Sequence, residues 1–440
     1  MLKRVYSLAR GSVAALGIAG VFAACDNGDK SNDLTGITTS QASKVKHVFV
    51  IMLENKNYDE TFGTSTQDPY LQKTLVPMGT LVTQYYGTGH VSLDNYISLI
   101  SGQSPTPDTE NDCVPGLTGL TGNYNNVVQT GLTADGQVIA SGGCIYASSV
   151  KTLPDQMVAA GLTWKGYMGD MGNDPTRESA TCGHPTLNGA DNTNTAAAPS
   201  AAVPKGDAYA TRHNPFMYFH SIIDSPLCQT NVVNLDRLTT DLGSVAATPN
   251  LVFITPNLCD DGHDGDGTGA AGKGCANGQP GGLKSADAFL ANWVPKILAS
   301  PAYQQDGMLL ITFDESGYTT TTATDSVTKH TTINIIFPGT TCCNEQPGPN
   351  ISANRPGSFS IVASASLTEN IVINGFGGDR VGAVLISPFV NAGSTSTTAY
   401  NHYSLLKTLE QIFGISSYLG YAGQTGLASM VSDTQIFKSN

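Results

Sequence analysis

Positive charge is scarce in this 440-residue chain, which has 22 lysines and arginines against 35 aspartates and glutamates, a net charge of −13. Nucleic-acid binding requires clustered cations that neutralise phosphates, so this balance excludes that class of function. Only 13% of the residues are charged and 40% are hydrophobic, which excludes an intrinsically disordered chain. The apolar run at residues 12–22 is too short for a membrane-spanning helix, and no other segment reaches that length.

Three motifs are absent from the sequence, and each absence argues against one kind of site. No C-x-x-C pair is present, which disfavours a zinc site built from cysteines. The G-x-S-x-G string of α/β-hydrolases is also missing. The Asp- and Gly-rich segment at residues 260–266 lacks the glutamate that completes an EF-hand loop, so we do not expect a calcium loop there.

The N-terminus has the pattern of a secretory signal. Lys3, Arg4 and Arg10 precede the apolar run, and Phe-Ala-Ala-Cys follows it, ending at Cys25. This ending resembles a bacterial lipobox with Phe in place of the usual Leu, which predicts a lipid anchor to the membrane through Cys25. Cleavage as an ordinary signal peptide after Ala23 or Ala24 is the alternative. We therefore expect a periplasmic or cell-envelope protein, lipid-anchored or else secreted.

The predicted organisation is a signal at residues 1–24, a polar tether at residues 25–44 and one catalytic domain at residues 45–440. Removal of the signal would leave 19 basic and 35 acidic residues, a net charge of −16. A phosphorylated substrate would then depend on local positive charge, which a metal ion could supply. No feature of the sequence indicates a protein partner.

Eight cysteines follow Cys25, and an even number in an exported chain implies disulfides. Connectivity cannot be derived from spacing, but pairs near in sequence are the simplest expectation. The neighbours Cys342 and Cys343 would bond to each other or pair elsewhere. The expected near pairs are Cys113 with Cys144, Cys182 with Cys228, and Cys259 with Cys275.

Alternation of strands and helices predicts an α/β sandwich with a largely parallel central sheet. Short, continuous apolar runs are typical of strands buried on both faces, and five such runs lie at residues 48–53, 251–255, 308–313, 333–337 and 381–386. Helical patterns occur at residues 153–160, 286–298 and 404–413. The polar segments 188–205 and 318–329 are expected to be surface insertions.

Oxygen donors follow two of these strands directly. Glu54 and Asn55 come after the run VFVIML, and Asp314 and Glu315 come after MLLITF. Ligands of open α/β sheets bind at the carboxyl ends of strands. Carboxylate and amide oxygens suit a divalent cation there. Alone, each pair also fits an ordinary solvated turn.

A glycine-containing loop leads to His90 and Ser92, and a helical pattern follows. Backbone N–H groups at a helix start would stabilise a serine alkoxide, so Ser92 is a candidate nucleophile. An N-cap role is the commoner use of such a serine. Three further histidines lie in polar turns near predicted strand ends or helix starts, where a surface or capping role is the simpler reading: His213, His263 and His402.

Together these segments resemble the bacterial phosphoesterase family that joins respiratory-burst-inhibiting acid phosphatases with phosphatidylcholine-type phospholipases C. The fold of that family is similar to the alkaline phosphatase superfamily. The resemblance rests on six segments in family order across the chain: HVFVIMLENKNYDETFG (47–63), YYGTGHVSLDNYISLISGQ (85–103), RHNPF (212–216), PNLCDDGHDG (256–265), LITFDES (310–316) and NHYSLLKTLEQIFG (401–414).

The resemblance implies one divalent metal ion, with Mg, Ca, Mn, Zn and Fe all open. Its implied ligands are Glu54, Asn55, Ser92, Asp314 and Glu315. Ser92 would also be the nucleophile. His90, His213, His263 and His402 would assist catalysis, and Asn55, His263 and His402 would contact the substrate. Asp261 is implied as an orienting residue or a ligand.

The implied activity is that of an exported phosphomonoesterase, an acid phosphatase that forms a phosphoserine and hydrolyses it. Protonated histidines near a phosphate would favour an acidic pH optimum. Phospholipase C activity on phosphocholine-type headgroups is the alternative, but those relatives are usually longer. A catalytically inactive metal-binding surface lipoprotein is a third reading. Sulfatases are excluded because the string at Cys113 lacks the arginine of their C-x-P-x-R motif.

Overall fold

The computed structural model describes residues 40–63, 67–114, 123–351, 357–364 and 366–440. Its body is built on an eight-stranded sheet, in which five consecutive strands, from β9 to β7, run parallel. This confirms the predicted α/β fold. The strand order is β15 (Ser394–Ser396), β2 (Thr80–Val82), β14 (Ala383–Ile386), β9 (Gly307–Phe313), β1 (His47–Leu53), β8 (Leu251–Thr255), β6 (Trp164–Met168) and β7 (Val232–Asn234).

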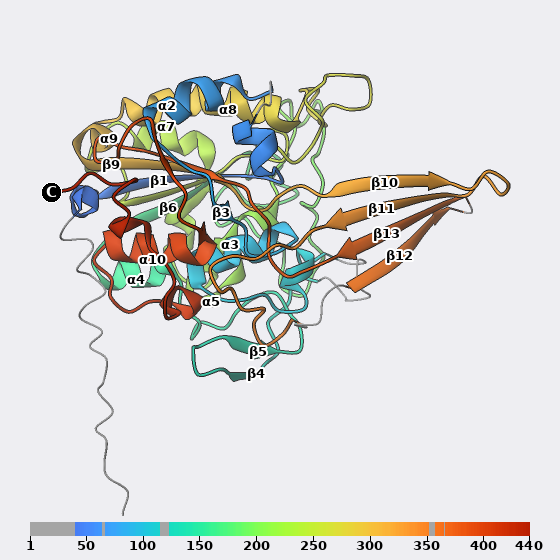
Figure 1. The fold of residues 1–440 in the computed structure, drawn as a ribbon, viewed down its shortest axis with the longest axis horizontal. Helices are drawn as coiled ribbons and strands as arrows, with labels where there is room; N and C mark the ends of the chain where they lie inside the picture. Colours follow the sequence, from blue (N-terminus) through green and yellow to red (C-terminus); the bar gives the residue numbers. More distant parts are fainter. Residues whose placement is uncertain (1–39, 64–66, 115–122, 352–356, 365) are drawn as a thin grey trace, which may run out of the picture.

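Helices cover both faces of this sheet. Figure 1 shows α8 and α9 on one side, and α3, α4 and α10 on the other. The α-helices of the described chain are α2 (Val76–Met78), α3 (Ser92–Ser101), α4 (Leu153–Ala159), α5 (His220–Ile223), α6 (Cys228–Asn231), α7 (Leu238–Asp241), α8 (Gly282–Leu298), α9 (Pro301–Asp306) and α10 (His402–Ile412). The three predicted helices correspond to α4, α8 and α10.

The two strands that precede the predicted oxygen donors lie side by side. β1 pairs with β9 in parallel along its whole length, from His47 opposite Gly307 to Leu53 opposite Phe313. All seven residues of each strand are buried, as continuous apolar runs predict for strands covered on both faces. Both strands therefore end at the same level of the sheet.

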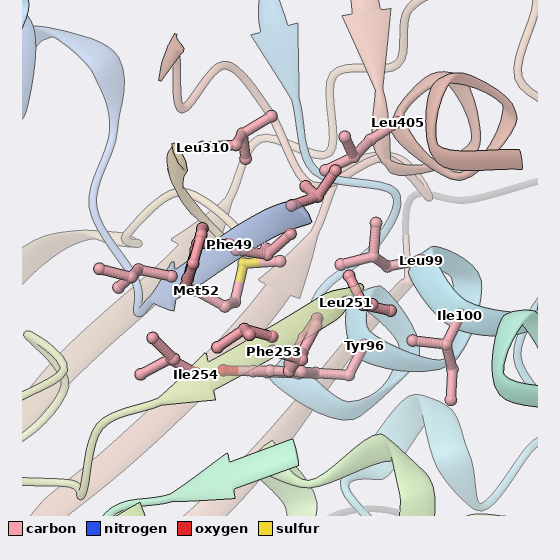
Figure 2. Close-up of a cluster of buried hydrophobic side chains, with 14 of the residues drawn as sticks. Phe49, Met52, Tyr96, Leu99, Ile100, Leu251, Phe253, Ile254, Leu310 and Leu405 are labelled. Carbon is pink, nitrogen blue, oxygen red and sulfur yellow. The ribbon is translucent and has the colours of Figure 1, made fainter. Parts of the chain in front are cut away.

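Apolar side chains of the sheet pack against the helices on one face. Figure 2 shows Tyr96 and Leu99 of α3 beside Phe253 of β8, with Leu405 of α10 in the same cluster. The Tyr96 and Phe253 ring centroids are 6.4 Å apart at 62°, an edge-to-face contact. This packing fixes α3, whose first residue is Ser92, against the sheet.

A second sheet of four strands projects from the body as an arm, at the right of Figure 1. Its order is β10 (Thr319–Thr324), β11 (Thr331–Phe337), β13 (Leu367–Ile373) and β12 (Gly357–Ser364). The prediction that residues 333–337 form a strand is confirmed, but the prediction that they are buried is wrong. All seven residues of β11 are partly exposed, because the arm projects away from the helices that cover the main sheet.

Two small sheets and four disulfides complete the described structure. β3 (Tyr85–Tyr86) pairs with β16 (Tyr400–Asn401), and β4 (Gln129–Leu132) pairs with β5 (Val138–Ala140). The three expected near pairs of cysteines are bonded. Cys342 and Cys343 bond to each other, which resolves the alternative left open by the sequence. The disulfides are Cys113–Cys144, Cys182–Cys228, Cys259–Cys275 and Cys342–Cys343.

The end of the predicted tether is packed onto the body. Ser40 forms a β-bridge with Ser439, and a short 3₁₀ helix spans Gln41–Lys44, with the Ala42 side chain in the core. The predicted signal and Cys25 lie outside the described residues. Among the residues that are described, none of the helices has the length and apolar character needed to cross a membrane.

Candidate active site

Glu54 and Asp314 emerge next to each other because β1 and β9 end in register. The ladder continues past the strands, since the Asp314 amide donates to the Leu53 carbonyl at 2.9 Å. On the other side of β1, the Glu54 amide donates to the Asp261 carbonyl at 2.9 Å. Asp261 lies in the loop after β8, which is parallel to β1. Three carboxylates from three adjacent strand ends therefore meet at one edge of the sheet.

Asn55 turns the chain away from this edge. Its φ of 56° is left-handed, a conformation that Asn tolerates better than most residues. The turn directs the Asn55 amide N–H to Asp314 Oδ1 at 2.9 Å, and the side-chain nitrogen to Glu54 Oε2 at 3.0 Å. Asn55 therefore connects the two carboxylates and holds them in place.

Ser92 opens α3 and points at the same carboxylates. Its Oγ donates to Glu54 Oε2 at 2.9 Å. The residue before it, Val91, offers no side-chain cap, and Asp112 Oδ1 instead accepts from the Leu93 amide at 2.9 Å. The hydroxyl is buried at a helix N-terminus, where the helix dipole favours negative charge on its oxygen.

His213 and Asp261 complete the cluster. His213 Nε2 lies 3.4 Å from Glu54 Oε2, and Nδ1 lies 3.3 Å from Asp261 Oδ2. The imidazole stacks on Tyr96 with ring centroids 5.6 Å apart and an interplanar angle of 11°. Tyr96 also donates its hydroxyl to Glu54 Oε1. The His213 ring and the Glu54 carboxylate are therefore fixed by the same helix that carries Ser92.

Three carboxyl groups share this buried cluster, where their charged forms are disfavoured unless a cation is present. Burial raises the pKa of Glu54 well above its ordinary value, and the carboxylates of Asp314 and Asp261 raise it further. Burial also raises the pKa of Asp261 and of Asp314. Burial lowers the pKa of His213 well below its usual range, with Arg212 and His263 acting in the same direction. The imidazole is thus neutral and does not offset the carboxylates.

Four nitrogen and oxygen atoms of the cluster that could bind a metal have no hydrogen-bond partner. They are both ring nitrogens of His213, Asp261 Oδ2 and Asp314 Oδ2, all buried. Unpaired buried polar atoms are costly unless something outside the chain satisfies them. Donor atoms of Glu54, His213 and Asp261 all lie within 4.8 Å of one another. Carboxylates and a neutral imidazole fit a divalent cation, which would also balance their charge.

Glu315, a predicted metal ligand, points elsewhere. Its Oε2 contacts His90 Nδ1, and His90 Nε2 lies 2.9 Å from Asp379 Oδ2. Although burial opposes it, Glu315 and Asp379 raise the pKa of His90 to about 9. With both nitrogens held by carboxylates, His90 joins Glu315 to the 379 loop in this arrangement. The ligand role of Glu315 and the catalytic role of His90 stay predictions.

The other two predicted histidines differ in exposure. His402 is buried, with Nδ1 2.9 Å from the Tyr85 hydroxyl and Nε2 2.6 Å from the Asp314 carbonyl oxygen. It therefore orients Asp314, and its predicted contact with substrate stays a prediction. His263 is 34% exposed and sits beside His213, with ring centroids 5.8 Å apart. Its Nδ1 contacts Asp264 Oδ1 at 2.7 Å, which leaves Nε2 available.

The sequence matches one protein family over most of its length. The profile of the Phosphoesterase family aligns with residues 65–416. The chain belongs to the Phosphoesterase family. The matched range includes Ser92, His213, Asp261 and Asp314, and it begins after Glu54. The family resemblance that was inferred from the six sequence segments is thereby confirmed.

Relatives of this Phosphoesterase family member include fungal proteins at low identity. A probable acid phosphatase of Kluyveromyces lactis is 21% identical over 280 residues, which are 64% of this chain and 50% of that protein. An acid phosphatase of Aspergillus fumigatus is 21% identical over 61% of this chain and 44% of its own length. A phosphate-repressible acid phosphatase of Penicillium chrysogenum is 22% identical over 91% of this chain and 68% of its own length. The chain spans about half the length of the first two.

Solved structures with a similar chain course have lower identity still. A protein in the alkaline phosphatase superfamily from Vibrio parahaemolyticus gives a TM-score of 0.39 at 11% identity, over 86% of this chain and 69% of that one. Murine ectonucleotide pyrophosphatase/phosphodiesterase 5 gives 0.42 at 13% identity, over 87% of this chain and 100% of that one.

Four residues of the site were not predicted from the sequence. Tyr96 follows Ser92 by four positions, and that spacing on a helix places both on one face, so this signal was available. Asp112 and its partner Arg212, 3.5 Å apart, support the start of α3. Asp379 holds His90 and accepts from the Gly339 and Thr340 amides. No local pattern marks either aspartate, because their partners lie far away in the sequence.

Proposed function

We propose that the protein is a metal-dependent phosphomonoesterase of the acid phosphatase type, with Ser92 as its nucleophile. The observation that carries the proposal is the 2.9 Å contact from Ser92 Oγ to Glu54 Oε2, at a helix start and beside four unpartnered metal-donor atoms. Glu54, Asp261, Asp314 and His213 would hold the cation. When bound, it would supply positive charge that favours the serine alkoxide and the charge developing on the phosphoryl oxygens.

Residues of the chain carry out the nucleophilic attack and the proton transfers. Ser92 Oγ gives its proton to Glu54 Oε2 and attacks phosphorus, the bond from phosphorus to the leaving oxygen breaks, and a phosphoserine forms. His263 Nε2 donates a proton to the leaving oxygen, while Asp264 holds the other ring nitrogen. Water then gives a proton to His263 Nε2 and attacks the phosphoserine, the bond from phosphorus to Ser92 Oγ breaks, and Glu54 returns its proton to Oγ as phosphate leaves. The dipole of α3 favours negative charge on Oγ in both steps.

Monoester hydrolysis is favoured over the phospholipase C alternative by the acid phosphatases among the relatives. Matched substrates separate the two: p-nitrophenyl phosphate for the monoesterase and phosphatidylcholine for the phospholipase. Purified protein that contains no divalent cation, and that hydrolyses neither substrate with any added metal, would favour the inactive lipoprotein. Export and lipidation of Cys25 concern residues outside the described structure and stay predictions.

Replacement of the nucleophile tests the proposal. We expect Ser92→Ala to abolish turnover of p-nitrophenyl phosphate at pH 5–7 while the thermal unfolding temperature stays near that of the native protein. Acid-quenched native enzyme should carry one phosphate, located by mass spectrometry on the peptide that contains Ser92. The same peptide of the variant should carry none.

Ser101→Ala is the matched control. Ser101 ends the same helix, is buried like Ser92, and bonds to the Ile97 carbonyl instead of a carboxylate. Turnover by this variant should stay close to native. Native turnover by Ser92→Ala, or phosphate trapped on a different residue, would refute the assignment.

A further inference from the structure

A cavity of 690 Å³ adjoins the candidate site. Asn55 and His263 lie in its wall. The side-chain amide of Asn55 donates to the same carboxylate oxygen, Glu54 Oε2, that accepts from Ser92. His263 is the residue proposed to protonate the leaving oxygen. The cavity is therefore where the leaving group of a phosphomonoester would lie, an assignment that rests on the proposed function.

Tyr318 projects into solvent at this cavity. It lines the cavity, and 55% of the residue is exposed. Its ring is supported from behind by Phe337, at 5.6 Å between centroids, and Phe337 contacts the His90 ring at 4.9 Å. Isolated exposed apolar residues need no explanation. Tyr318 differs from such isolated residues because its ring packs against Phe337 at the edge of the cavity while part of the ring stays exposed.

Acidic side chains outnumber basic ones in the rest of the wall. Asp59, Glu60 and Asp266 line the cavity, and all three are exposed. Arg380 neutralises one of them, through Nη2 to Asp59 Oδ1 at 3.0 Å. The Lys56 ammonium is tied to the Asn55 and Gly262 carbonyl oxygens at 3.1 and 2.8 Å. With Asp59 paired to Arg380, the carboxylates of Glu60 and Asp266 still outnumber the single Lys56 ammonium, so an anionic leaving group would meet a net negative charge in this cavity.

We propose that this cavity selects phosphomonoesters whose leaving group is aromatic and uncharged, and that Tyr318 is the residue that recognises the aromatic ring. Aromatic pairs prefer offset or edge-to-face contacts and contribute beyond their buried area, a preference of roughly 2- to 12-fold. Saturated rings lack this contribution. Carboxylated rings have it but are repelled by Glu60 and Asp266.

Two substrates with the same chemistry test the role of the ring. Benzyl phosphate and cyclohexylmethyl phosphate both release a primary alcohol, so they differ in the aromatic contact and hardly in the bond broken. We expect kcat/KM to favour benzyl phosphate in the native enzyme. In Tyr318→Ala this preference should fall by roughly 2- to 12-fold through KM, with kcat little changed. Tyr318→Phe should retain it.

Charge selection is tested with 4-carboxybenzyl phosphate. We expect the native enzyme to use it less well than benzyl phosphate, and Asp266→Asn to narrow that gap. Asn retains the acceptor oxygen that Thr268 contacts through its amide and its hydroxyl, so the loop should keep its shape. Val327→Ala is the control, because Val327 is 85% exposed in the turn between β10 and β11 and does not line the cavity.

Failure of this inference can be told apart from failure of the proposed function. An active enzyme whose preference for benzyl phosphate is unchanged by Tyr318→Ala overturns the selection by Tyr318. An active enzyme that prefers 4-carboxybenzyl phosphate overturns the charge selection. A native protein that hydrolyses neither p-nitrophenyl phosphate nor any of these three substrates, with any divalent cation, overturns the proposed function itself.

Discussion

β9 (GMLLITF) and β11 (TTINIIF) both contain an apolar run that predicts a buried strand, yet the two strands lie in different environments. All seven residues of β9 are buried, whereas all seven of β11 are partly exposed. β9 lies inside the main sheet between β1 and β14, with helices on both faces. β11 lies in the arm, which extends away from the body. An apolar run therefore predicts a strand, but the layers that cover a strand decide its burial.

The two regions also contribute differently to function. The body brings Glu54, Asp261 and Asp314 together, because adjacent parallel strands end at one edge. The arm contributes Tyr318 and Phe337 at its base, where β10 begins and β11 ends. We infer that the body carries the chemistry and that the base of the arm modifies which substrates reach it.

The same substitution in β9 and in β11 is expected to show the largest difference in stability between the two regions. Ile311→Ala in β9 removes a fully buried side chain and should lower the free energy of unfolding by about 2–5 kcal/mol. Ile335→Ala in β11 removes a partly exposed one and should lower it by roughly half as much. Denaturant unfolding of both variants measures this. Equal losses would mean that the arm is packed as tightly as the body.

Removal of single disulfides should sharpen the contrast. Cys259–Cys275 closes a loop of sequence separation 16 that carries Asp261 and His263, so replacing both cysteines by serine should cost about 3 kcal/mol and most of the activity. Cys342–Cys343 joins neighbours and closes no such loop. Serine at both of those positions should change the unfolding temperature much less. The reverse order of effects would contradict the loop-closure argument.

Replacement of Asp170, which lies in the turn after β6, should give the smallest change in the free energy of unfolding, and that change should depend on pH. Burial raises the pKa of this carboxyl from 3.8 to about 6. Above pH 6 the folded state holds an unfavourable buried charge, and below about pH 3 the carboxyl is protonated in both the folded and the unfolded state, so the penalty is fully present at high pH and absent at low pH.

Asp170→Asn should therefore stabilise the protein by about 1–3 kcal/mol at pH 7.5 and have little effect at pH 3. Asn keeps an acceptor for the Ala208 amide, 3.2 Å away, and tolerates the left-handed φ of 62°. Thermal unfolding at the two pH values measures the change. Stabilisation of the same size at both would show that the charge is not its source.

Much of the site was predictable because its chemistry is local. Glu54, Asn55 and Asp314 follow apolar strands, and Ser92 starts a helix after a glycine-containing loop. The convergence of Glu54 and Asp314 followed from the general rule for strand ends in parallel sheets. The near disulfides were predictable for a similar reason, since short loops bring their ends together readily.

The remaining site residues were not predictable from local pattern. Glu315 adjoins Asp314 in sequence, yet it contacts His90, and Asp261 lies with Glu54 instead. Alternation along an extended chain sends neighbouring side chains to opposite faces, and only the neighbours on each face decide what they meet. The position of His402 was not predictable for the same reason, because its contact with the Asp314 carbonyl depends on where α10 packs.

The sequence alone determined the chemical groups, the strands and helices that carry them, and the family to which the chain belongs. The tertiary structure decided which strand ends are neighbours, which of the carboxylates share a buried cluster, and which apolar strands are covered. The reason is that strand and helix formation depends on residues a few positions apart. Burial and charge coupling depend on contacts between segments hundreds of residues apart, such as the pairing of β1 with β9.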